Sequence, residues 1–98
     1  MAKRARSQER PGSEQEHPDL VAWARVVDAA QLTEQTAKEA EDYLSQYRHL
    51  GWAARREFGL RLAAVVASQV SPPPPATIAP LDILATAVAA RRRQLGIG

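Results

Sequence analysis

Apolar residues repeat at helical spacing in four segments of the chain, and glycine, proline or helix-capping residues separate these segments. The first segment begins at Pro18-Asp19, where Asp19 is a suitable N-cap, and ends near Ala30. Its apolar residues recur at i, i+3 and i+7, and they are Leu20, Trp23 and Val27. This spacing predicts a helix of about three turns with Trp23 as its anchor in the core.

The second segment begins after Thr33, whose side chain can cap the free amides of the first helical turn. Its apolar stripe consists of Ala37, Ala40, Tyr43 or Leu44, Tyr47 and Leu50. This stripe predicts a helix that reaches Leu50. Glu39, Glu41 and Asp42 point in different directions on such a helix and lack the spacing of a metal-binding loop. They predict a solvated acidic face rather than a cation site.

The third segment follows Gly51 and runs from about Trp52 to Val70. Its expected buried stripe consists of Phe58, Leu62, Val65 or Val66, and Gln69 or Val70. Gly59 lies in the middle of this helix, where glycine costs up to about 1 kcal/mol relative to alanine. The simplest explanation is that a neighbouring helix approaches closely at Gly59.

Four consecutive prolines separate the third helix from the last one, and they are Pro72, Pro73, Pro74 and Pro75. A proline disfavours helical conformation in the residue before it, so the third helix should end at or before Ser71. Such a run favours polyproline II, which makes a stiff spacer of about 12 Å, close to the width of one helix. The last helix should open at Pro80 and stop at Gly96. Its apolar stripe consists of Leu81, Leu84, Val88 and Leu95.

Together these patterns predict an all-α fold, a small bundle of about four helices with a polyproline crossover before the last helix. Residues 18–98 should form the bundle, and residues 1–17, which are polar and charged, should form a disordered arm. Besides the four prolines, the expected structural residues are Trp23, Leu44, Tyr47, Phe58, Gly59, Leu62, Leu84 and Val88.

The composition gives no sign of catalytic chemistry. Much of the 45% hydrophobic share of the 98 residues is alanine, which favours helices but adds little core volume. The absence of cysteine excludes disulfides and thiolate metal sites. His17 and His49 have no nucleophile in a recognisable motif nearby, and no glycine-rich phosphate loop occurs. We therefore expect no enzymatic activity, no cofactor and no metal site.

The net charge of +2 is distributed unevenly, with −3 over residues 17–50 and +4 over residues 51–98. Six arginines in the basic part are candidate partner-binding residues, and they are Arg55, Arg56, Arg61, Arg91, Arg92 and Arg93. They either complement the acidic second helix and the dipole of the last helix, or they contact anionic lipid or an acidic partner. No apolar run approaches the roughly 20 residues that span a bilayer.

A family resemblance rests on sequence features that cover about three quarters of the chain. They include Leu20-Val21-Ala22-Trp23-Ala24, Tyr43-Leu44, Val70-Ser71 before the four prolines, and Arg91-Arg92-Arg93 after Leu84-Ala85 and Val88-Ala89. This pattern resembles the soluble region that follows the transmembrane part of actinobacterial RDD-family membrane proteins. The hydrophobic helices that carry the family's arginine and aspartates have no counterpart here. Ala90 stands where an acidic residue commonly precedes the arginine triplet.

The resemblance implies a non-enzymatic interaction domain that acts in the cytoplasm at or near the membrane through its basic face. The expected partner is a membrane protein or an anionic lipid surface. The alternative is a small nucleic-acid-binding protein that uses the basic arm and the arginine triplet, although the weak net charge and the lack of basic–aromatic interleaving count against it. A homodimer is a further hypothesis, because a small bundle with slim alanine faces can complete its core by dimerising.

Overall fold

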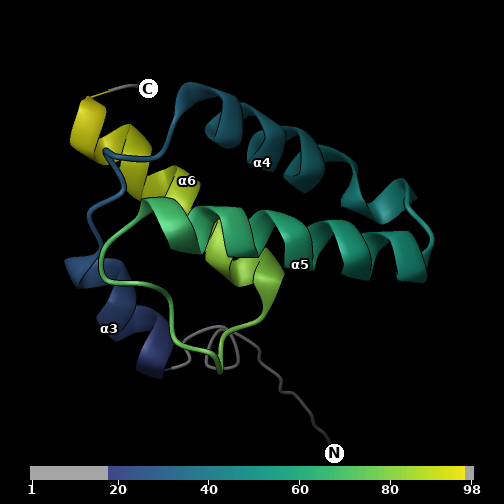
Figure 1. Ribbon diagram of the computed structural model, residues 1–98, viewed down its shortest axis with the longest axis horizontal. Helices are drawn as coiled ribbons and strands as arrows, with labels where there is room; N and C mark the ends of the chain where they lie inside the picture. The colour runs from purple at the N-terminus through teal and green to yellow at the C-terminus, as the bar shows by residue number, and fades with distance from the viewer. Residues whose placement is uncertain (1–17, 97–98) are drawn as a thin grey trace, which may run out of the picture.

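Four α-helices make up most of residues 18–96, the part of the chain that this computed structural model describes (Figure 1). They are α3 (Pro18–Val26), α4 (Glu34–Gln46), α5 (Trp52–Gln69) and α6 (Pro80–Leu95), and a 3-10 turn, η1 (Tyr47–His49), continues α4. The predicted all-α bundle of about four helices is confirmed. The disordered arm predicted over residues 1–17 lies outside the described residues, as do residues 97–98.

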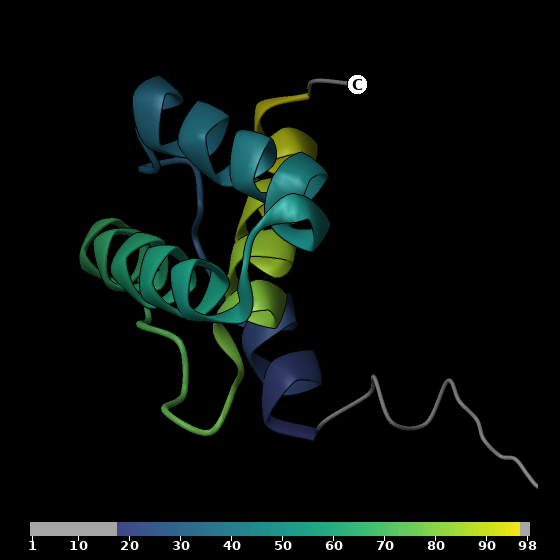
Figure 2. The same cartoon turned by 90° about the vertical axis from the view of Figure 1, so that its right-hand side faces the viewer.

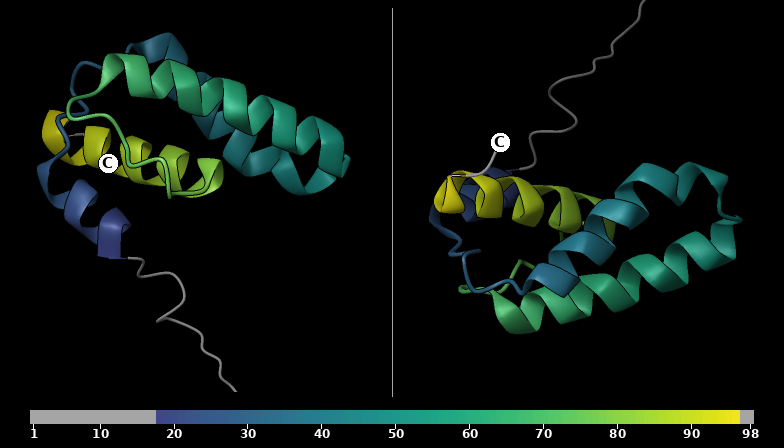
Figure 3. Two further views of the ribbon diagram at one scale, coloured as in Figure 1. Left: turned by 60° about the horizontal axis from the view of Figure 1, so that its bottom comes forward. Right: turned by 90° about the horizontal axis from the view of Figure 1, so that it is seen from above.

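Helix α6 lies at the centre of the bundle and contacts each of the other three helices. Figure 2 shows α6 with α4 beside its upper end, α3 below its lower end and α5 to one side. Helices α4 and α5 are antiparallel, and the turn that joins them lies at the end of the molecule away from α3 (Figure 3). The last helix therefore packs on the other three after the proline crossover, in agreement with the predicted bundle.

Local sequence signals set several helix ends as predicted. The Thr33 side chain caps α4 and accepts a hydrogen bond from the backbone amide of Thr36 at 3.1 Å. Pro80 is the first residue of α6, where its missing amide hydrogen costs nothing. Gly96 ends α6 with a φ of 72°, a left-handed conformation that glycine adopts without a steric penalty.

Helix α3 ends at Val26, so the prediction that it continues to near Ala30 is wrong. The backbone of the next residues bonds to distant parts of the chain instead. The Asp28 amide donates to the Ser71 carbonyl at 2.7 Å in an isolated antiparallel bridge. The Gln94 side chain bonds to the residues on both sides of Asp28. The chain leaves the helix here because these partners satisfy backbone groups that another helical turn would otherwise satisfy.

Hydrogen bonds join the proline crossover to α3. The indole Nε1 of Trp23 donates to the Pro72 carbonyl at 2.8 Å, and the Ser71–Pro72 peptide bond is cis. Further along the crossover, the Thr77 hydroxyl donates to Asp19 Oδ2 at 2.8 Å. Asp19 itself lies within the first turn of α3 and not at the N-cap position that the sequence suggests, since the helix already begins at the preceding residue.

The buried stripe of α5 differs from the predicted one. Gly59, Ala63 and Val66 are the buried residues of α5. Phe58, predicted as a core anchor, is 45% exposed. The small residues allow Tyr43 and α6 to come close to α5, so the contact face passes through Gly59 and Ala63 instead of Phe58 and Leu62, whereas Val66 and Val70 are buried as predicted. Phe58 is thereby turned toward the edge of the bundle, and its predicted core role is wrong.

The other predicted anchors lie in or beside the core. Trp23, Leu84 and Val88 are buried, as predicted. Leu44, Tyr47 and Leu62 are half-buried and pack against the core from its edge. Leu95 is exposed, against the prediction, because the last turn of α6 contacts the α3–α4 loop through polar side chains rather than through leucine.

Candidate functional site

The structure does not gather the six candidate arginines on one face. Arg55, Arg56 and Arg61 lie along the first half of α5, and the arginine triplet lies at the end of α6. Figure 1 shows that the start of α5 and the end of α6 lie at opposite ends of the bundle. The basic face expected from the sequence is therefore divided into at least two separate places.

Arg55 is half-buried and bonded within the fold. Its Nη2 donates to the Leu50 carbonyl at 3.2 Å, and its guanidinium lies over the Tyr47 ring, 5.6 Å from the ring centroid. The Arg55 carbonyl accepts a hydrogen bond from the Tyr43 hydroxyl at 2.6 Å. Arg55 thus holds the start of α5 against the end of α4.

Three further arginines have partners within the protein. Arg61 pairs with Glu57 on its own helix at 3.2 Å. Arg91 Nε donates to the Leu32 carbonyl at 3.1 Å, and Arg92 pairs with Glu41 of α4 at 3.0 Å. Both ion pairs are exposed and therefore contribute little stability. The acidic second helix is complemented by Arg92 of the last helix and not by the arginines of α5.

Arg56 and Arg93 are exposed and have no partner among the described residues. Arg93 lies at the end of α6, and the other two arginines of the triplet, Arg91 and Arg92, already have partners. This leaves little free charge in the arginine triplet for a nucleic acid. Arg56 has a different setting, because it lies close to other cationic and apolar side chains at the start of α5.

The first candidate surface is the hairpin tip, defined as Arg48 in the turn between α4 and α5 and Trp52, Arg56 and Leu60 in the first half of α5. Trp52 is 77% exposed and Leu60 is 48% exposed. They line a shallow depression of about 230 Å³, together with Arg56 and the start of α6. No acidic residue occurs in the sequence between Asp42 and Glu57, so the turn itself and the first residues of α5 carry only positive charges.

Arg48 adds a charge that does not titrate in the physiological range. Its guanidinium lies 5.9 Å from the centroid of the Tyr47 ring. The interaction with Tyr47, through hydrogen bonding first and electrostatic attraction second, raises the pKa of Arg48 above its ordinary value. Arg48 and Arg55 both approach the Tyr47 ring, and this places Arg48 next to the start of α5.

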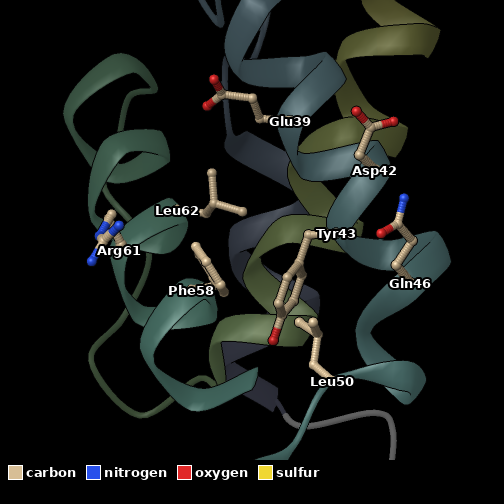
Figure 4. A pocket seen from close by; sticks show the side chains of 8 residues that line it. All are labelled: Glu39, Asp42, Tyr43, Gln46, Leu50, Phe58, Arg61 and Leu62. Atoms are coloured by element: carbon tan, nitrogen blue, oxygen red, sulfur yellow. The ribbon is translucent and has the colours of Figure 1, made fainter. Parts of the chain in front are cut away.

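The second candidate surface is the α4–α5 groove, which has a volume of about 490 Å³. Its lining residues are Glu39, Asp42, Tyr43, Gln46, Leu50, Phe58, Arg61 and Leu62. Figure 4 shows the α4 side chains on one side of the groove and Phe58, Arg61 and Leu62 of α5 on the other. The floor is apolar, and two carboxylates stand on the α4 rim.

The described residues contain no group of histidine, cysteine, aspartate and glutamate side chains that could hold a metal ion. His49 lies exposed in η1, and no nucleophilic residue is bonded to it. Within residues 18–96, no helix combines the length and the apolar character needed to cross a membrane.

Comparisons of the chain with protein-family models, with curated proteins and with solved structures find no match. The resemblance to the soluble region of RDD-family proteins stays a prediction from the residues quoted above. The assignment of a function depends on the two surfaces themselves.

Both surfaces include apolar residues of α5 that the sequence reasoning assigned to the core or passed over. Trp52, Phe58 and Leu60 are spread around the circumference of α5. An amphipathic helix with one buried face leaves its other faces polar. Apolar residues occur on several faces of α5, and one buried face cannot cover all of them. This pattern was the signal in the sequence that some apolar residues of α5 stay exposed to solvent.

Proposed function

We propose that this chain is a non-enzymatic interaction domain that binds an anionic membrane surface in the cytoplasm through its hairpin tip. The observation that carries the proposal is the exposure of Trp52 beside Arg56, with Arg48 four residues earlier in the sequence and no acidic residue between Asp42 and Glu57. Tryptophan favours the membrane–water interface, where its ring is partly apolar and its N–H remains hydrated. Arginine side chains beside it are attracted to anionic headgroups.

The position of the hairpin tip suits docking onto a flat surface. The turn between α4 and α5 projects at one end of the molecule, away from α3 (Figures 1 and 3). Arg48 and Arg56 are exposed, and neither is paired with a described carboxylate. With two arginines that no described carboxylate neutralises and one tryptophan, the association should be weak, reversible and sensitive to salt, because charges near a surface are screened over about 10 Å at 0.1 M salt.

The test is co-sedimentation of the full chain with phosphatidylcholine vesicles, with and without phosphatidylserine, at low and moderate salt. We expect binding only to the anionic vesicles and weaker binding at moderate salt. Trp52→Ala and the double change Arg48→Ala with Arg56→Ala should each reduce binding. Brominated lipid should quench the accessible fluorescence of Trp52 but not that of Trp23, which is 3% exposed.

Matched controls lie elsewhere on the molecule. Arg93→Ala removes an exposed arginine at the end of α6, and Val26→Ala removes an exposed apolar side chain of α3. Neither change should affect binding to vesicles. The absence of binding at low salt would reject the proposal, and so would a loss of binding in Arg93→Ala as large as that in the double variant of Arg48 and Arg56.

A further inference from the structure

The α4–α5 groove has an apolar floor that no further helix of the described residues covers, and only the Arg61 guanidinium lies over the Phe58 ring, 5.6 Å from its centroid. Phe58 is 45% exposed, and Leu50 and Leu62 are only half-buried. In Figure 4 these three side chains lie around the Tyr43 ring, between α4 and α5. Burying such side chains is favourable in proportion to the apolar area removed from water, so the floor is suited to an apolar partner surface.

The α4 rim of the groove carries two carboxylates whose charge is not neutralised. Glu39 accepts a hydrogen bond from the neutral Gln35 amide at 3.2 Å, and the Asp42 carboxylate is in no ion pair with a described residue. On the opposite rim, the Arg61 charge is balanced by Glu57 at 3.2 Å. The free charge beside the apolar floor is therefore negative, in contrast to the cationic hairpin tip.

We propose that the α4–α5 groove binds a cationic amphipathic helix of a partner protein. An apolar stripe at i, i+3 or i+4, and i+7 would fill the floor around Phe58 and Leu62, as in other complexes of a helix in a groove. Lysine or arginine beside that stripe would face Glu39 and Asp42 and fix the orientation of the helix. This inference is independent of the membrane proposal, because the two surfaces lie on different sides of α5.

Two occupants from this chain itself fit the groove less well. Residues 1–16 supply positive charge but contain only Met1, Ala2 and Ala5 as apolar side chains, which is too little to fill the floor. In residues 18–96 of a second copy, Arg55, Arg61, Arg91 and Arg92 already have partners, so these cations are not available to face Glu39 and Asp42.

The experiment uses a fluorescently labelled synthetic helix of roughly 18 residues with a leucine stripe at this spacing and lysines beside the stripe. A matched peptide carries glutamate in place of each lysine. Fluorescence anisotropy with the full chain at low salt should detect binding of the cationic peptide and not of the acidic one. The double change Glu39→Gln with Asp42→Asn should weaken binding by about three- to tenfold at low salt, and by less at high salt.

The apolar floor is tested by a matched pair on the same helix. Phe58→Ala should weaken peptide binding by about tenfold or more, because it truncates the most exposed anchor of the floor. Leu60→Ala is the matched control, because Leu60 is 48% exposed and Phe58 is 45% exposed. Leu60 lies outside the groove, so its replacement should not change peptide binding. Phe58→Ala should also leave vesicle binding unchanged. Thermal unfolding verifies that each variant is folded. If Phe58→Ala does not fold, the carboxylate variants still test the proposal.

Three results would overturn the proposal. The first is the absence of binding by the cationic peptide at low salt. The second is binding of the acidic peptide as strong as that of the cationic peptide, or a loss of binding in Leu60→Ala as large as that in Phe58→Ala. The third is self-association in light scattering that Phe58→Ala abolishes while the cationic peptide does not bind, since this would assign the groove to a second copy of the chain.

Discussion

The hydroxyl of Tyr43 lies where a side chain at Gly59 would have to be. A Cβ atom placed on Gly59 would lie 2.8 Å from Tyr43 Oη and 3.5 Å from Pro80 Cβ. The same hydroxyl donates to the Arg55 carbonyl at 2.6 Å. The missing side chain at Gly59 therefore allows α4, α5 and α6 to meet at one point, and it gives the Tyr43 hydroxyl access to a backbone carbonyl of α5.

Gly59→Ala should destabilise the protein, although alanine favours helices more than glycine does. The higher helix preference of alanine adds up to about 1 kcal/mol to the free energy of unfolding, but forcing extra volume into a packed contact lowers it by about 1–3 kcal/mol. Tyr43 cannot turn away freely because its ring is rigid and buried and its hydroxyl is bonded. We expect a net loss of about 1–2 kcal/mol in urea unfolding followed by circular dichroism.

Gly51→Ala is the matched control for this prediction. Gly51 is the residue before α5, its φ is −60°, and a Cβ atom there would meet no heavy atom within 4 Å. The change in stability should stay within about 0.5 kcal/mol. If Gly59→Ala proved as stable as Gly51→Ala, the close contact at Tyr43 would not limit the packing of α5.

A double-mutant cycle separates the steric contact from the hydrogen bond. Tyr43→Phe alone should cost about 1 kcal/mol, because the hydrogen bond to Arg55 is lost. The same change removes the atom closest to a Cβ at position 59. Gly59→Ala should then cost less in the Tyr43→Phe background than in the natural chain, with a coupling of about 1 kcal/mol. Additive costs would contradict a direct contact between the two positions.

Features that depend on neighbouring residues were predictable from the sequence. The cap at Thr33, the stop at Gly96 and the close approach at Gly59 each follow from the conformation or size of one residue. The buried positions of Trp23 and Leu84 follow from helical spacing. These signals were sufficient for the fold class because short connections and apolar stripes leave few ways to pack four helices.

The candidate surfaces depend on contacts between residues far apart in the sequence. Arg91 bonds to Leu32, 59 positions away, and such a pairing has no local signature. The exposure of Phe58 depends on where α6 crosses α5, and the small residues after it allow that crossing. The sequence therefore identified arginines as a group but could not separate those that hold the fold together from those that remain free.

Trp23→Phe should be strongly destabilising even though an aromatic ring is retained. Trp23 is 3% exposed, and its indole N–H donates to the Pro72 carbonyl at 2.8 Å. Phenylalanine is smaller and has no donor, so the change loses core contacts and leaves that carbonyl without its partner. We expect a loss of about 2–3 kcal/mol in urea unfolding.

Trp52→Phe is the control for the tryptophan prediction. Trp52 is 77% exposed and makes no hydrogen bond through its indole within the described residues, so its replacement should change stability by less than about 0.5 kcal/mol. A small effect of Trp23→Phe, similar to that of Trp52→Phe, would show that the proline crossover is held by other contacts.

Gln94→Glu tests the bonds that end α3. The Gln94 amide oxygen accepts from the Ala29 amide, and its nitrogen donates to the Val27 carbonyl, both at 2.8 Å. An ionised carboxylate can accept from the Ala29 amide but cannot donate to the Val27 carbonyl. A carboxylate oxygen would therefore face the Val27 carbonyl oxygen. At neutral pH we expect a loss of about 1–2 kcal/mol in urea unfolding, at least as large as the loss in Gln94→Ala, which removes both bonds without adding a charge.

The pH dependence distinguishes this bonding from a general effect of charge. A protonated carboxyl can donate to Val27 and accept from Ala29, as the natural amide does. Folding should therefore raise the pKa of the introduced carboxyl above its unfolded value of about 4.3. The protonated form then contributes stability that is fully present below about pH 4 and is lost as the pH rises through the folded pKa. Urea unfolding of both variants at neutral and acid pH should show Gln94→Glu approaching or exceeding the stability of Gln94→Ala as the pH falls. A constant difference between the two variants would contradict a donor requirement at Val27.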